Sequence, residues 1–315
     1  MKKTIVSFVI LFVFALFDSP SFKGEDSDIQ NPPFKNSAQK AIEGVIFIKG
    51  GCFEMGDVFG DGDKPGKPPH TVCLKDFYLA KEDVTVKSFR QFTDETHYQT
   101  EAEEPFGEAK EAVGCVGWSG KEWKVDKKTN WKTPGFKQGD NYPVVCVTWK
   151  DSNKFAEWKS KRTGFAWRLP TEAEWEFAAR NRGKKIKFSW GDVPPKGNVG
   201  DMAFKKEVPN NPVWEGYNDG YPFTSPVDAF KPNELGLNDM TGNVWQWVQD
   251  WYNEEYYKQS SRDDPQGPLK GEMRVLRGGS WGNGDPANLR TTYRGHFIPD
   301  ARSNFLGFRL ALSPL

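Results

Sequence analysis

The side chains of this 315-residue chain with the most distinct chemistry are its four cysteines. They are Cys52, Cys73, Cys115 and Cys146, and no two of them have the Cys-x-x-Cys spacing of thioredoxin-like or zinc-ribbon sites. In an oxidising compartment they would form disulfides, for which four cysteines allow three pairings. We favour Cys52–Cys73 and Cys115–Cys146, because each pair lies in extended-looking stretches and closes a modest loop. The alternative is four buried thiols.

The N-terminus indicates export to such a compartment. Two lysines precede an apolar run over residues 4–17, which has the length of a signal-peptide core and is too short for a membrane-spanning helix. Ser19 and Ser21 offer small residues for cleavage. We predict a signal peptide over residues 1–21, a flexible lead-in over 22–40, and a periplasmic or extracellular location. The alternative is an uncleaved anchor.

The composition excludes several classes of protein. With 43 basic and 43 acidic residues the net charge is zero, which argues against a nucleic-acid partner. A mean hydropathy of -0.70 excludes a transmembrane bundle. The 15% of aromatic residues exclude a disordered chain. The 31 glycines and 22 prolines predict many ordered loops and little long helix.

Short strands are predicted early in the chain. One strand is expected from Val45 to Met55, followed by a loop rich in Gly, Pro and Asp over residues 56–69. The alternation of apolar residues predicts a second extended stretch from His70 to Leu79.

Three helices are predicted further along. The first covers residues 86–95. The second starts with Asp151 as its N-cap and stops at Gly164. The third begins at the capping box of Thr171 and Glu174 and ends near Gly183. Because no linker follows residue 40, we expect one α+β domain over residues 41–315.

Seven motifs occur in one order between Val45 and Leu312. They are Gly50-Gly-Cys-Phe-Glu-Met-Gly56, Phe77-Tyr-Leu-Ala-Lys-Glu-Asp-Val-Thr85, Tyr142-Pro-Val-Val-Cys-Val-Thr-Trp149, Arg168-Leu-Pro-Thr-Glu-Ala-Glu-Trp-Glu-Phe-Ala-Ala-Arg180, Gly236-Leu-Asn-Asp-Met-Thr-Gly-Asn-Val-Trp-Gln-Trp247, Arg274-Val-Leu-Arg-Gly-Gly-Ser-Trp281 and Gly307-Phe-Arg309. Together they resemble the formylglycine-generating enzyme family, also called sulfatase-modifying factors. The resemblance implies a C-type-lectin-like α+β fold with little regular secondary structure and many turns.

The resemblance also raises the question of copper. Family members that make formylglycine oxidise a substrate cysteine with oxygen, and hold copper between two cysteines shortly after the Gly-Gly-Ser motif. Here Asn283 stands at the first of these positions and the second falls near Pro286. No cysteine follows Cys146. Because thiolates are the ligands that suit Cu(I), we do not expect this chain to make formylglycine by the copper mechanism.

A cleft of the family's shape would remain. The resemblance places in or beside it Ser280, Trp281, Asn283, Arg290 and Arg294. Ser280 could hydrogen-bond a ligand, and the two arginines could bind a carboxylate or phosphate. The structural alternative for the arginines is an ion pair with a local carboxylate, for which Asp285 and Asp300 are the first candidates.

The catalytic residue is unknown, with Ser280, Asn283 and His296 as candidates. His296 with Asp285 or Asp300 could contribute to an iron site, but this stretch has no second histidine for a two-histidine facial triad. The sequence therefore leaves open whether the protein binds iron.

Structural calcium is a further implication of the resemblance, because family members hold Ca²⁺ with side-chain and backbone oxygens. One site matches Asn198, Val199, Asp219 and Tyr221, where the valine and tyrosine contribute carbonyls. A second matches Asp239, Gly242 and Val244, but Gln246 stands where a glutamate is usual. Losing that carboxylate weakens the second site.

Two functions remain for an exported member of this family. One is a binding or scaffolding protein of the cell envelope with a small-molecule, peptide or protein ligand. The other is a non-copper oxidase or modifying enzyme. Its nearest analogy is an exported relative in siderophore maturation, and it rests on the fold alone.

Overall fold

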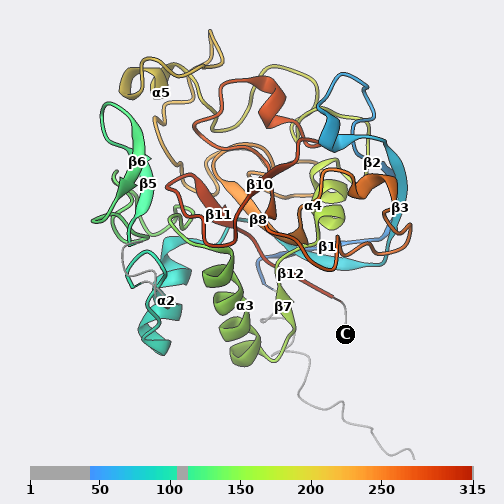
Figure 1. Ribbon diagram of the computed structural model, residues 1–315, viewed down its shortest axis with the longest axis horizontal. Coiled ribbons are helices and arrows are strands. Elements are labelled where there is room, and N and C mark those ends of the chain that lie inside the picture. Colours follow the sequence, from blue (N-terminus) through green and yellow to red (C-terminus); the bar gives the residue numbers. More distant parts are fainter. Residues whose placement is uncertain (1–42, 105–112, 314–315) are drawn as a thin grey trace, which may run out of the picture. The chain divides into compact units, whose positions relative to one another are not determined.

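The computed structural model describes residues 43–104 and 113–313, which belong to one compact unit, Ile42–Leu315. The predicted signal peptide (1–21) and lead-in (22–40) lie outside the described residues. The first four-stranded sheet has the antiparallel order β1 (Val45–Ile48), β4 (Phe77–Ala80), β12 (Ala311–Leu312) and β7 (Trp167–Arg168). It therefore pairs the beginning of the described chain with its end (Figure 1).

The second four-stranded sheet carries the glycine motifs. Its order is β10 (Gly295–Phe297), β9 (Arg274–Arg277), β8 (Trp245–Trp251) and β11 (Leu306–Phe308), and β11 runs parallel to β8. Two hairpins complete the described strands: β2 (Gly51–Met55) with β3 (His70–Leu74), and β5 (Cys115–Trp118) with β6 (Trp123–Asp126). This mixture of short strands, few helices and long turns confirms the expected α+β fold.

The prediction of one strand from Val45 to Met55 is wrong. The chain turns at Lys49 and Gly50 between β1 and β2, which join different sheets. At Gly50 the backbone passes so close to β3 that a Cβ would lie 2.2 Å from the carbonyl oxygen of Leu74. The extended stretch predicted from His70 to Leu79 is likewise split, at Lys75 and Asp76.

Helix α2 (Val86–Thr96) confirms the first predicted helix. Helix α3 (Trp149–Thr163) ends at Gly164 as expected, with φ of 78° at that residue. The N-cap of α3 is Thr148 and not the predicted Asp151. Asp151 is the third helical residue, and its carboxylate accepts the backbone N–H of Thr148 while the Thr148 hydroxyl accepts that of Asp151.

Helix α4 (Glu172–Ala179) begins at the predicted capping box, in which Thr171 and Glu174 accept each other's backbone N–H. It ends earlier than expected, because Asn181, Arg182 and Gly183 all have positive φ. A short helix that was not predicted, α5 (Met202–Glu207), is capped by Asp201. Three 3-10 turns cover Lys64–Gly66, Tyr256–Lys258 and Pro286–Leu289.

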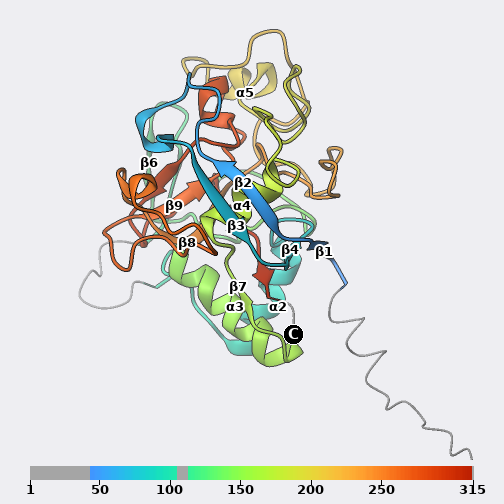
Figure 2. The same ribbon diagram turned by 90° about the vertical axis from the view of Figure 1, so that its right-hand side faces the viewer.

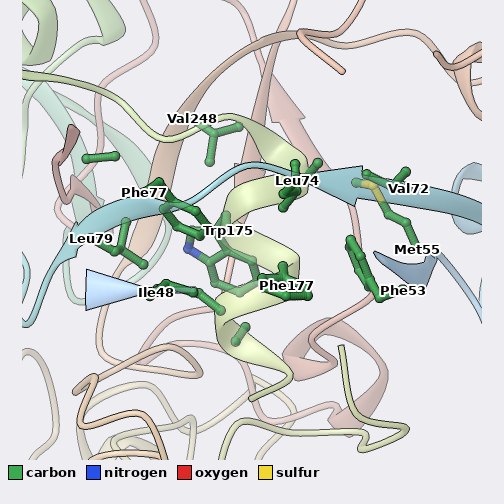
Figure 3. Packing of buried hydrophobic residues seen from close by; sticks show 14 of the residues in the cluster. Ile48, Phe53, Met55, Val72, Leu74, Phe77, Leu79, Trp175, Phe177 and Val248 are labelled. Atoms are coloured by element: carbon green, nitrogen blue, oxygen red, sulfur yellow. The ribbon is translucent and has the colours of Figure 1, made fainter. Parts of the chain in front are cut away.

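The main core forms around α4. Trp175 and Phe177 project from this helix among side chains of β1 to β4, including Ile48, Leu74 and Phe77 (Figure 3). Trp175 is fully buried. Helices α2 and α3 lie side by side in both views (Figure 1, Figure 2), joined by stacked Phe89 and Phe155. Burial of these aromatic rings fixes the helices that support the second sheet.

Both expected disulfides are present, Cys52–Cys73 and Cys115–Cys146. The first joins directly opposed residues of β2 and β3. The second ties the β5–β6 hairpin to the segment before α3, and both of its cysteines are fully buried. In the described part of the chain, none of the helices has the length and apolar character needed to span a membrane.

Candidate functional site

A tight turn after β9 presents Ser280 and Asn283. Gly278 and Gly279, with φ of 102° and 73°, lead from β9 into this turn. A Cβ on Gly279 would lie 2.6 Å from a methyl group of Leu289 and 3.1 Å from the carbonyl oxygen of Asn288, and the positive φ itself favours glycine. The side-chain oxygen of Asn283 accepts hydrogen bonds from the backbone N–H and the hydroxyl of Ser280, each at 2.9 Å. The two polar side chains are therefore held in one orientation.

This turn forms one wall of a hollow of about 240 Å³. Its lining combines aromatic and small polar groups: Val116, Trp123, Asn211, Trp245, Ser280, Gly282, Asn283 and Phe305. Among the described residues, no Asp, Glu, His, Lys, Arg or Cys side chain lines it. Aromatic walls with a few fixed polar groups suit the binding of an uncharged ligand. Among the described residues of this lining, none carries a side chain that commonly serves as a general acid or base.

Trp281 lies beneath this turn as part of the core. It is fully buried, and its ring lies edge-on to Phe204 and Phe223 with centroids 5.5 and 5.2 Å away. Its indole N–H donates to the carbonyl of Asn304 at 3.2 Å. Trp281 therefore supports the floor of the hollow without being exposed in it.

The structure does not bring Arg290 and Arg294 to this hollow. Arg290 forms a two-pronged ion pair with Asp61, in which Nη2 lies 3.0 Å from Oδ2, and hydrogen bonds from Arg290 and Lys187 lower the pKa of Asp61. Arg294 binds the buried carboxylate of Glu172. Burial alone would raise the pKa of Glu172, but the charges of Arg294 and Arg277 and the hydrogen bonds from Arg294 and Tyr257 together hold this pKa below its usual value.

The expected partners of these arginines are engaged elsewhere. The Asp285 side chain accepts the backbone N–H of Ala287, and Asp300 forms an ion pair with Lys150 at 2.8 Å. The carboxylates that do pair, Asp61 and Glu172, are more than 100 residues away in sequence from the arginines. Spacing along the chain could not have identified them.

His296 also lies apart from Ser280. It stacks on Tyr252 with centroids 3.8 Å apart, and it lines a small hollow of about 80 Å³ with Asp57, Asp63 and Arg294. Burial lowers the pKa of His296, which favours the neutral ring. The carboxylate of Asp57 accepts three backbone N–H groups of its own loop. Among the described residues, no group of three His, Cys, Asp or Glu side chains could hold a metal ion.

The residues of the first calcium site do come together. Asp219 accepts the backbone N–H of Val199 at 3.1 Å and that of Tyr221 at 2.7 Å. Asn198 is fully buried, and its side-chain oxygen has no hydrogen-bond partner among the described residues. No described Lys or Arg forms an ion pair with Asp219. Asn198 precedes Val199 in the chain, and a carboxylate and an unpartnered amide oxygen are both ligand types that suit a hard ion such as Ca²⁺.

The second set of residues fits calcium poorly. The side-chain oxygen of Gln246 already accepts two hydrogen bonds, from Trp175 and Arg309, both at 2.7 Å. The amide nitrogen of Gln246 donates to the carbonyl of Asp239 at 2.8 Å. The Asp239 carboxylate accepts from Asn243, and burial raises the pKa of Asp239 to about 7. The neutral side chain of Gln246 is thus engaged in hydrogen bonds at the position where a glutamate would offer a charged ligand.

Several residues of the Ser280 hollow had no individual signal in the sequence. Trp245 belongs to one of the seven motifs and Trp123 to none of them, yet both line the hollow. Val116, Asn211 and Phe305 come from three distant segments that only the fold brings together.

The chain is similar to known proteins over most of its length. Residues 30–314 match the sulfatase-modifying factor enzyme 1-like domain. A formylglycine-generating enzyme of Streptomyces coelicolor is 36% identical over 86% of this chain and 90% of that protein. The protein of Mus musculus named inactive C-alpha-formylglycine-generating enzyme 2 is 33% identical over 85% of each. The structure of PvdO from Pseudomonas aeruginosa has a TM-score of 0.66 and 28% identity, and covers 86% of this chain and 94% of that one.

Proposed function

The chain belongs to the formylglycine-generating enzyme (sulfatase-modifying factor) family, and we propose that within this family it is an exported ligand-binding protein that does not make formylglycine by copper chemistry. The proposed ligand is a small molecule, or a peptide or envelope-protein segment, whose uncharged group enters the hollow beside Ser280.

The observation that carries this proposal is the position of Asn283 and its hydrogen bonding. It stands where the family resemblance places the first copper cysteine, and its side-chain oxygen is held by two hydrogen bonds from Ser280. All four cysteines of the chain form disulfides. An amide cannot replace a thiolate as a ligand for Cu(I), whereas a fixed amide and hydroxyl can orient a bound ligand.

Two further findings support the binding function. The aromatic rings of Trp123, Trp245 and Phe305 offer the hollow's apolar contact area. The family also contains a mouse protein that is named inactive, at 33% identity to this chain. Export to the periplasm or the extracellular space stays part of the proposal, and the two disulfides support it.

The test uses the whole chain purified without reductant. Neutral small molecules and short peptides are screened by the shift in melting temperature, and hits are compared with Gly282→Leu. A Cβ at Gly282 has contacts no closer than 3.9 Å, so leucine should fill the hollow without distorting the backbone. Gly139→Leu, on an exposed loop with its Cβ 3.6 Å from Tyr142, is the matched control.

We expect some compounds to raise the melting temperature of the parent protein and of Gly139→Leu. The same compounds should not raise the melting temperature of Gly282→Leu. A parallel assay incubates the chain with a cysteine-containing peptide, Cu(I) and oxygen, and follows aldehyde formation by mass spectrometry. Formation of formylglycine would overturn the proposal. Oxygen consumption with a hit compound, lost in Gly282→Leu, would replace it with the oxidase alternative.

A further inference from the structure

A second and larger hollow, of about 450 Å³, opens beside the β5–β6 hairpin. Its apolar wall is formed by Val116, Val125, Phe297, Ala301, Phe305 and Leu306. Val125 and Phe297 are 53% and 43% exposed, and the adjoining Ile298 is 54% exposed. Large apolar side chains that stay exposed around a concave surface are typical of a binding site.

Two cations flank this apolar wall at Gly114. The Nε of Arg302 donates to the carbonyl oxygen of Gly114 at 2.6 Å, and its Nη1 donates to the carbonyl of Asp300 at 2.9 Å. A Cβ on Gly114 would lie 2.7 Å from the Cα of Lys127, so the backbone of this lysine adjoins the same glycine. Both cationic residues line the hollow. The guanidinium of Arg302 is therefore oriented before any ligand arrives.

Neither cation is neutralised within the described residues. No carboxylate there forms an ion pair with Lys127 or Arg302. The acidic residue of the lining, Asp300, is paired with Lys150 at 2.8 Å. Counting the described residues alone, the mouth of the hollow thus carries an excess of positive charge next to an apolar wall, although the net charge of the chain is zero.

We propose that this hollow binds a free small-molecule carboxylate with an aliphatic or aryl body. The carboxylate would accept hydrogen bonds from Arg302 and attract Lys127, while the body covers Val125 and Phe297. Covering these exposed side chains supplies the apolar part of the binding free energy. This site is distinct from the proposed Ser280 hollow, with which it shares only Val116 and Phe305.

Calorimetric titration of the whole chain with decanoate, below its micelle concentration, tests the proposal. Decan-1-ol and decyltrimethylammonium are the neutral and cationic comparisons. We expect decanoate to bind best. Lys127→Ala should weaken it about threefold, as for an exposed ion pair, and Arg302→Gln about tenfold. Val125→Asp, which adds a negative charge to the mouth, should abolish binding.

The matched controls are Lys128→Ala, the next exposed lysine, and Val193→Asp, an exposed valine elsewhere; neither residue lines the hollow. Because Arg302 also holds Gly114, its variant needs a melting curve. The exposed Lys127 and Val125 keep the test decisive if that variant unfolds. Equal binding of decanol and decanoate, or no effect of Lys127→Ala and Val125→Asp, would overturn the proposal.

Two further measurements distinguish a free carboxylate from a lipid surface, and this hollow from the one beside Ser280. Co-sedimentation with phosphatidylglycerol vesicles that depends on Val125, without binding of free decanoate, would assign the surface to a membrane and overturn the proposal. Gly282→Leu should leave decanoate binding unchanged, because it fills only the Ser280 hollow. These experiments can therefore overturn the proposed binding at one hollow without affecting the proposed binding at the other.

Discussion

Arg294 binds the carboxylate of Glu172 through two parallel hydrogen bonds, with Nε 2.7 Å from Oε1 and Nη2 2.8 Å from Oε2. Arg294 is 4% exposed and Glu172 is 2% exposed. The remaining nitrogen of Arg294 donates to the carbonyls of Pro65 and Asn253. An arginine that the family resemblance places at a ligand site thus joins the start of α4 to two loops.

This arrangement predicts a large loss of stability in Arg294→Met. The substitution leaves the buried charge of Glu172 with only Arg277, 3.7 Å away, and the hydroxyl of Tyr257. Loss of the main partner of a buried charge costs about 3–5 kcal/mol in the free energy of unfolding. Urea unfolding of both proteins measures the difference. The control is Arg90→Met, which breaks the exposed pair of Arg90 with Asp140 and should cost less than about 1 kcal/mol. Similar losses in both variants would contradict the structural role of Arg294.

Calcium should stabilise the protein through the first site alone. At a calcium concentration about 100 times the dissociation constant, the expected gain is about 2.7 kcal/mol. Asp219→Asn and Asn198→Ala should remove most of this gain, whereas Asp228→Asn, at an exposed carboxylate bound to Asn141, should keep it. Calcium stoichiometry and melting curves with and without chelator measure both effects. A calcium response that survives in Asp219→Asn would contradict the ligand set.

Gln246→Glu should create the second calcium site. The glutamate can still accept from Trp175 and Arg309, but its other oxygen would face the carbonyl of Asp239 in place of a donated hydrogen bond. Without calcium we expect a loss of about 1–3 kcal/mol, because a buried acceptor loses its donor. With calcium, the stability should return and one more ion should bind per chain. Gln249→Glu, at the less buried glutamine of β8, serves as the comparison.

The buried carboxyl of Asp250 predicts a pH dependence of stability. Burial, with the nearby charge of Glu172, raises the pKa of Asp250 to about 8. The folded state therefore keeps a proton that the unfolded state has lost. This contribution to stability is complete below the unfolded pKa of about 4 and is lost as the pH rises through about 8.

Asp250→Asn should remove this dependence. Its amide oxygen can still accept the backbone N–H of Glu172, which Asp250 now binds at 2.8 Å. Relative to the parent, the variant should gain stability with rising pH, by at most about 1.4 kcal/mol per pH unit. Denaturant curves between about pH 5 and 8 measure this gain. Parallel profiles for parent and variant would show that Asp250 ionises normally in the folded protein.

The two disulfides should differ in their reactivity. Cys52 is exposed, whereas Cys115 and Cys146 are fully buried. Mild reductant on the folded protein should therefore open Cys52–Cys73 first, and differential alkylation with mass spectrometry identifies the opened pair. Removing either bridge by alanine substitution should cost about 2–4 kcal/mol, because each constrains the unfolded chain. Early labelling of Cys115 would contradict its buried position.

Features of this protein that depend on residues close together in the chain could be predicted from the sequence. The capping box of Thr171 and Glu174 and the stop at Gly164 depend on neighbours in the chain, so both were predictable. The ordered motifs were specific enough to identify the family, and the disulfide pairing followed from short loops in extended segments.

Contacts between distant segments were decided only by the tertiary structure. At Gly50, where the predicted strand breaks, the carbonyl oxygen of Leu74 lies too close for any side chain. The partners of Arg290 and Arg294 come from segments 229 and 122 residues away, and Gln246 meets Trp175 and Arg309 across the core. A charged side chain selects its partner by distance in space, and the sequence states only distance along the chain.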